Sequence, residues 1–133
     1  MKRYIVLVLF LFSSLSCENK VGLKEIKYDD VFNQKENRYC VLFYSSSCPS
    51  CINTIEILNK RYEQIKYTGF LVNIKDLDIT YSKEKVSNLY KENINEIIFT
   101  SVPYLVFISN GSIEKELYGY TNIQKENLYI FFE

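Results

Sequence analysis

The sequence predicts an α/β domain in which a mixed β-sheet is flanked by helices. Apolar runs typical of buried strands alternate with segments whose apolar residues recur at helical spacing. The motif Cys48-Pro49-Ser50-Cys51 lies between one such run and one such segment. Asn110-Gly111, a strong turn signal, separates two later strand-like runs. The resulting order, β-α-β-α-β-β-α, places helices on both faces of one sheet.

The elements of the first half surround the cysteine pair. We expect a short capped turn of helix within 26–34 and a buried strand over 38–44. A second strand is expected over 70–74, where another apolar run follows a glycine. Between them, residues 49–65 predict a helix with one apolar face, formed by Ile52, Ile55, Leu58, Tyr62 and Ile65.

The second half contains another helix, a hairpin and a terminal helix. We expect a helix over 83–93, with Val86, Leu89 and Tyr90 facing inward. Residues 76–101 are long for a connection, which predicts an insertion that shapes a groove beside the site. Strands over 104–109 and 113–118 form the hairpin. The last helix, 122–132, has as core candidates Ile123, Leu128, Phe131 and Phe132.

The position of the two cysteines indicates redox chemistry. Only a thiolate attacks a disulfide, and a helix N-terminus stabilises a thiolate through its free N–H groups and dipole. Cys48 holds that position and is the expected nucleophile, and Pro49 suits the first helical turn. Cys51, one turn further on, is the expected resolving thiol. The dithiol carries two electrons itself, so no cofactor is expected.

Other interpretations of the cysteines stay open. A structural disulfide between Cys48 and Cys51 would close so short a loop that it would constrain the unfolded chain little. Zinc is disfavoured because tetrahedral sites take about four ligands, whereas the chain has no histidine and four cysteines in all. Cys40 alternates with Val41 along its strand, which predicts a buried free thiol. A third redox thiol or an intermolecular disulfide is the alternative for Cys40.

The chain resembles the thioredoxin-like family over residues 31–133. The resemblance depends on the cysteine motif after a strand and on Ser101-Val102-Pro103-Tyr104, which is followed by Asn110-Gly111. It implies the thioredoxin-like three-layer fold and a cis bond before Pro103, beside Cys48. It also implies that Val102 offers its backbone to substrate, with Pro49 and Ser50 lining the same surface. Without the resemblance, Pro103 also fits the start of an edge strand, in trans.

The chain departs from thioredoxins at several positions. Ser47 replaces the usual tryptophan before the first cysteine, and Pro49-Ser50 replaces Gly-Pro between the two. Leu42 occupies the position of a buried acidic residue that assists the resolving thiol in that family. These differences argue against the behaviour of a general cytosolic reductase, and they leave the direction of electron flow open.

The first residues have the features of an export signal. Lys2 and Arg3 precede an apolar stretch over 4–15, which is shorter than the ~20 residues that a transmembrane helix needs. Residues 14–17, Ser-Leu-Ser-Cys, resemble a bacterial lipoprotein cleavage box, which makes Cys17 the expected lipidation site. We therefore divide the chain into a signal peptide (1–16), a tether (17–25) and a domain (26–133). A cleaved soluble form and an uncleaved anchor are the alternatives.

Composition and charge limit the classes of partner. The 16 Lys and Arg residues balance the 16 Asp and Glu residues and are mixed with them, so no nucleic-acid surface is predicted. We expect a monomeric thiol–disulfide oxidoreductase of the cell envelope, lipid-anchored to the membrane and facing its extracytoplasmic side. Its partners would be protein thiols or disulfides and one further redox protein. The alternative is a thioredoxin-like binding module with a structural disulfide and no turnover.

Overall fold

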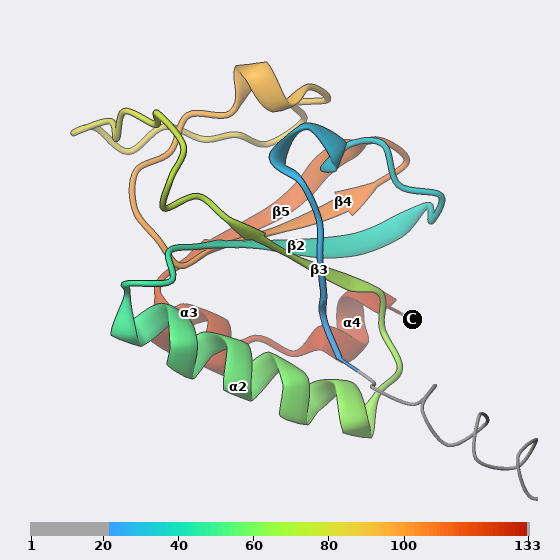
Figure 1. Ribbon diagram of the computed structural model, residues 1–133. Coiled ribbons are helices and arrows are strands. Elements are labelled where there is room, and N and C mark those ends of the chain that lie inside the picture. Colours follow the sequence, from blue (N-terminus) through green and yellow to red (C-terminus); the bar gives the residue numbers. More distant parts are fainter. Residues whose placement is uncertain (1–21, 133) are drawn as a thin grey trace, which may run out of the picture.

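The computed structural model describes residues 22–132, which build a five-stranded sheet in the order β1-β3-β2-β4-β5 (Figure 1). β3 pairs in parallel with β1 and with β2, whereas β4 pairs antiparallel with β2 and with β5. The predicted mixed sheet is therefore confirmed. The strands are Lys24–Glu25 (β1), Arg38–Tyr44 (β2), Gly69–Asn73 (β3), Tyr104–Ser109 (β4) and Ser112–Tyr118 (β5).

β2 is the central strand and is buried on both faces. Six of its seven residues are buried, because β3 and β4 flank the strand and its side chains enter core clusters on both faces of the sheet. A strand covered on both faces is expected to be continuously apolar, as 40–43 are. Tyr44 pairs with Asn73, and Phe43 with Tyr104. The end of β2, the end of β3 and the start of β4 therefore lie at the same edge of the sheet.

Three helices cover one face of the sheet (Figure 1). α2, Pro49–Gln64, matches the predicted helix within one residue and buries Cys51, Thr54 and Leu58. Ile52 was expected in the core but is 43% exposed, so that assignment was wrong. The predicted terminal helix is broken into α3, Tyr120–Lys125, and α4, Leu128–Phe132. The predicted apolar residues of both still pack onto this face.

The opposite face is covered mainly by irregular chain rather than by long helices. Among the described residues, the helical turns on this face are two short 3-10 helices, η1 (Tyr28–Asp30) and η2 (Ile94–Glu96). They enclose an aromatic cluster in which ring centroids lie 5.0 to 6.4 Å apart, made of Tyr28, Phe43, Phe99 and Tyr104. This layer seals the second side of the core without regular secondary structure.

The helix predicted over 83–93 does not form. Tyr90 is 77% exposed and adopts a positive φ of 68°, and Leu89 is also exposed. Asn88, which was not among the residues expected to face inward, is fully buried. Its Nδ2 donates to Ile98 O at 2.8 Å and to the Tyr104 hydroxyl at 3.0 Å. Its Oδ1 accepts from Ile98 N at 2.9 Å and from Lys91 Nζ at 2.9 Å.

The Asn88 network, as we call Asn88 with Lys91, Ile98, Tyr104 and Glu116, explains the irregular chain. The Tyr104 hydroxyl donates to Glu116 Oε2 at 2.6 Å, and the Asn88 N–H donates to the same oxygen at 3.1 Å. Burial and the hydrogen bond to Glu116 raise the pKa of Tyr104 far above its usual value, so it remains a donor. These long-range bonds satisfy polar groups that a helix would have satisfied locally.

The N-terminal side adds a strand that the sequence did not predict. Lys24 and Glu25 were assigned to the tether but form β1, which pairs with Phe70 and Leu71 of β3. The ordered domain therefore begins before residue 26. The predicted signal peptide and the expected lipidation site, Cys17, lie outside the described residues. Within the described part of the chain, no helix has the length and apolar character needed to cross a bilayer.

Candidate active site

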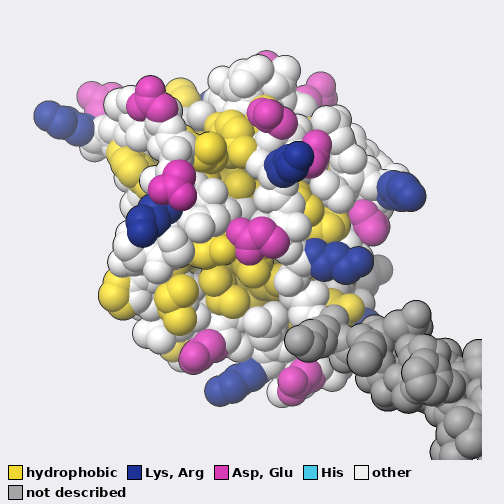
Figure 2. Space-filling view, viewed as in Figure 1, with side chains coloured by type: hydrophobic (Ala, Val, Ile, Leu, Met, Phe, Trp, Pro, Cys, Tyr) yellow, Lys and Arg dark blue, Asp and Glu magenta, His cyan; other side chains and the backbone are white. Residues whose placement is uncertain are grey.

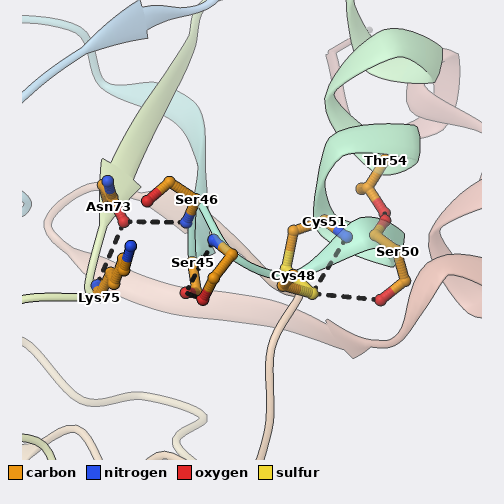
Figure 3. Close-up of a disulfide and its surroundings, with 9 residues drawn as sticks. Ser45, Ser46, Cys48, Ser50, Cys51, Thr54, Asn73 and Lys75 are labelled. Carbon is orange, nitrogen blue, oxygen red and sulfur yellow. Dashed lines mark hydrogen bonds between the residues drawn. A yellow bond between two sulfur atoms is a disulfide. The ribbon is translucent and has the colours of Figure 1, made fainter.

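Cys48 caps the N-terminus of α2, as predicted. Its backbone is extended (φ −100°, ψ 111°), and its sulfur accepts a hydrogen bond from the Cys51 N–H at 3.2 Å (Figure 3). Pro49 occupies the first helical position, where its lack of an N–H costs no hydrogen bond. The Cα atoms of Cys48 and Cys51 are 5.2 Å apart, and the two residues form a disulfide.

The two sulfurs differ in access. Cys51 is fully buried, whereas Cys48 is only partly buried and is followed by the exposed residues Pro49 and Ser50. A bulky polypeptide disulfide can therefore approach Cys48 but not Cys51. This asymmetry matches the predicted roles, with Cys48 attacking the substrate and Cys51 attacking the mixed disulfide.

Ser50 brings a second donor to the same sulfur. Its Oγ lies 3.3 Å from Cys48 Sγ, and Thr54 Oγ1 donates to the Ser50 carbonyl at 2.7 Å (Figure 3). A hydroxyl donor is more favourable beside a thiolate than beside a disulfide sulfur, because hydrogen bonds to charged groups are the stronger ones. Ser50 therefore favours the reduced, ionised state of Cys48.

The loop before Cys48 is tied to the end of β3 by Asn73. Its Oδ1 accepts from Ser46 N at 3.3 Å and from Lys75 N at 3.1 Å (Figure 3). The Cys48 N–H donates to Ser45 O at 3.0 Å, which closes the turn. Sequence reasoning did not select Asn73. The available signal was a polar residue at the end of a buried strand, next to the chain segment that carries the cysteines.

The Val102–Pro103 bond is cis, as the resemblance implied. Pro103 is buried, and its carbonyl accepts from the Gly119 N–H at 2.9 Å. Gly119 has a φ of 84°, which a side chain would disfavour. Val102 and Cys48 both pack against the apolar cluster on the α2 face. The strand register also places 102–103 and the cysteine loop at one edge of the sheet.

Beneath the site, the chain is apolar at the position where the resemblance implied a buried acidic residue. Leu42 and Cys40 are buried on the α2 face. Burial raises the pKa of the Cys40 thiol to about 12, so it stays protonated, as expected for a small apolar core residue. Glu25 of β1 accepts a hydrogen bond from the Tyr44 hydroxyl at 2.8 Å.

Neither a metal-ligand cluster nor a patch of one charge adjoins the cysteine pair in the described part of the chain. Among residues 22–132, no group of three His, Cys, Asp or Glu side chains is arranged to hold a metal ion. Figure 2 shows that acidic and basic side chains are mixed on the visible face, with apolar side chains reaching the surface between them.

Comparisons with known proteins support the fold. No protein-family model and no curated protein matches the sequence. Mitochondrial thioredoxin 3 from Saccharomyces cerevisiae, in its oxidized form, is 14% identical with a TM-score of 0.54, covering 74% of this chain and 84% of its own.

Two further solved structures are similar. Spinach chloroplast thioredoxin f has a TM-score of 0.53 at 16% identity, covering 74% of this chain and 76% of its own. Chlamydomonas reinhardtii thioredoxin f2 has a TM-score of 0.51 at 16% identity, covering 74% and 85%. The chain therefore has the thioredoxin-like α/β fold, with a close cysteine pair at the start of α2.

Proposed function

We propose that this protein is a thiol–disulfide oxidoreductase of the bacterial cell envelope that exchanges disulfides with protein substrates through Cys48 and Cys51. The observation that carries the proposal is the asymmetry of the pair: a partly accessible Cys48 at a helix N-terminus and a fully buried Cys51 behind it. A disulfide with only a structural role would not need a thiolate-stabilising environment around one of its sulfurs.

In the reducing direction, the Cys48 thiolate attacks one sulfur of a substrate disulfide. A Cys48–substrate bond forms, the substrate S–S bond breaks, and the departing substrate sulfur takes a proton from water. Cys51, after losing its proton to water, attacks Cys48 Sγ and displaces the second substrate sulfur. The substrate gains two electrons, and the protein is left with the Cys48–Cys51 disulfide. The oxidising direction is the same sequence in reverse.

The surface around the pair is proposed to hold the substrate. Pro49 and Ser50 are exposed next to Cys48, and Val102 lies partly exposed before the cis bond to Pro103. A free backbone at Val102 would pair with an extended substrate segment, as strand addition generally does. The sheet register supports this arrangement, because both segments leave the same edge of the sheet.

The envelope location is supported by the first seventeen residues. The basic pair, the apolar stretch and the box ending at Cys17 together favour export and lipidation. Acyl chains on Cys17 would then anchor a monomeric domain to the membrane on the side where disulfides persist. Incorporation of labelled palmitate in cells tests this, with Cys17→Ala as the control; equal labelling of both forms would refute it.

The first measurement is the reduction potential of the Cys48–Cys51 pair in the full-length chain. A value near −270 mV would indicate a reductase with an upstream electron source, and one near −120 mV an oxidant of folding proteins. Cys48→Ser should abolish exchange, whereas Cys51→Ser should accumulate mixed disulfides. If the wild-type pair does not exchange with dithiothreitol, and a Cys48→Ser, Cys51→Ser double variant still binds its partner, the binding-module alternative is correct.

A further inference from the structure

A groove lies beside the outer edge of β5, away from the cysteine pair. It has a volume of about 390 Å³ and is open to solvent on one side. One wall is the insertion at 85–87, and the other is the end of β5. β5 is the last strand in the sheet, so this edge is the one that an added strand could extend. The lining residues are Lys85, Val86, Ser87, Glu116, Leu117, Tyr118 and Asn122.

Some backbone N–H and C=O groups of β5 point towards this groove. In an antiparallel pair, successive residues direct their peptide groups alternately to the partner strand and away from it. Gly119 directs its N–H to Pro103 O on the β4 side, so Tyr118 and Glu116 direct theirs outward. The Tyr118 carbonyl accepts from Asn122 Nδ2 at 2.8 Å. Within 22–132, no residue pairs with the Tyr118 N–H or with the peptide groups of Glu116.

Further along the same edge of β5, the insertion itself forms backbone hydrogen bonds with the strand. At the start of β5, the Tyr90 N–H donates to Ile113 O at 2.7 Å, and the Ile113 N–H donates to Lys91 O at 3.0 Å. The insertion then leaves the strand at Asn88, whose N–H bonds the Glu116 carboxylate instead of the β5 backbone. The groove is therefore the part of this edge where the protein's own chain has separated from the strand.

We propose that this groove binds an extended segment of the substrate polypeptide, which adds a strand to β5 through the main chain of Glu116 and Tyr118. The inference rests on the proposed function and adds a second contact region to it. Outward N–H and C=O groups on one strand edge match another extended backbone, whatever its sequence. The adjoining side chains, apolar Val86 and Leu117 with Lys85 at the rim, fit the mixed surface of an unfolded chain.

One end of the groove lies near the surface proposed to hold the substrate. Tyr118 adjoins Gly119, and Gly119 is hydrogen-bonded to the carbonyl of Pro103. A polypeptide that lies along Val102 can therefore continue past the end of β5 and into the groove. A small disulfide that reaches only Cys48 would gain nothing from it. The groove should thus favour unfolded protein substrates over short ones.

The test compares two substrates in the full-length chain: scrambled ribonuclease A, a long polypeptide, and oxidised glutathione, a short one. Val86→Trp fills the groove with bulk. Leu89→Trp adds the same bulk to an exposed position on the same segment that does not line the groove. For Val86→Trp, the ratio of kcat/KM for ribonuclease to that for glutathione should fall about tenfold, as expected from losing one or two backbone hydrogen bonds. For Leu89→Trp the ratio should stay at the wild-type value.

Each outcome separates the inference from the function beneath it. If Val86→Trp turns over both substrates with an unchanged ratio of kcat/KM values, the groove does not bind substrate, and the proposed oxidoreductase function still stands. Wild-type protein that exchanges with neither substrate overturns the proposed function itself. A wild-type dimer on gel filtration that Val86→Trp converts to a monomer means that a second copy occupies the edge, and this also overturns the inference.

Discussion

Asn88 should be the side chain whose loss most weakens the irregular layer of this fold. Its amide makes four hydrogen bonds from a fully buried position, to Ile98 N, Ile98 O, the Tyr104 hydroxyl and Lys91 Nζ. Asn88→Ala removes all four. Two of the partners keep another hydrogen bond, because the Tyr104 hydroxyl still donates to Glu116 and Lys91 Nζ still donates to Glu96 O at 2.7 Å. Ile98 loses both of its bonds to this side chain.

The magnitude follows from these bonds. A hydrogen bond contributes about 0.5–1.5 kcal/mol net, so four of them, two with surviving alternatives, contribute about 3 kcal/mol. For a domain of this size, that loss lowers Tm by roughly 12 °C or more. It is also a large share of the ~5–15 kcal/mol that stabilises a typical domain. Asn88→Asp should be no better, because it loses both donors and places a second carboxylate beside Glu116.

The assay is urea unfolding at 25 °C, followed by far-UV circular dichroism and tyrosine fluorescence, since the chain has no tryptophan. Asn95→Ala is the matched control, because Asn95 lies on the same segment but is exposed. Its stability should stay within about 0.5 kcal/mol of wild type. If Asn88→Ala unfolds at the same urea concentration as Asn95→Ala, the network does not hold the segment and the reasoning is refuted.

Two further predictions concern the site and the core. Ser50→Ala should destabilise the reduced form by about 1 kcal/mol, because it removes the hydroxyl beside Cys48 Sγ. The reduction potential of the cysteine pair should therefore become about 20 mV more negative. Ser47→Ala is the control, because its hydroxyl faces Ser45, and equal potentials for the two variants in glutathione buffers would contradict the prediction. Burial raises the pKa of Cys40 from 9.0 to about 12 in the folded protein. As the pH rises, the unfolded chain therefore loses this proton before the folded chain does. The stability that Cys40 contributes should be complete below pH 9 and should fall between pH 9 and 12. Urea midpoints across that range should fall less steeply for Cys40→Ala than for wild type, and parallel curves would exclude the thiol as a cause.

Much of the cysteine site was predictable because its determinants are local. The extended Cys48, the proline after it and the first turn of α2 occupy four consecutive residues. Their preferences follow from capping and from the fixed φ of proline. The strand before them and the hairpin at Asn110-Gly111 were also predictable, from a continuous apolar run and from a turn signal. The cis bond at Pro103 came from the resemblance and not from local preference.

The elements that were predicted wrongly depend on partners far away in the sequence. Helical spacing in 83–93 was real, but Asn88 forms better bonds with Tyr104 and Glu116, sixteen and twenty-eight residues away. Ile52 had the right spacing for the core, yet it remains 43% exposed. Lys24 and Glu25 are polar and become a strand only because β3 offers them an edge.

The sequence alone thus predicts which sulfur should act as the nucleophile, since a thiolate is stabilised by groups within one turn of helix. It also specifies the alternation of strands and helices that gives the α/β class. The folded chain adds what no local pattern contains: the burial of Cys51, the anchoring of the loop by Asn73, and the open edge of β5 beside the insertion. These features depend on which strands become neighbours, and that depends on the free energy of packing the whole sheet.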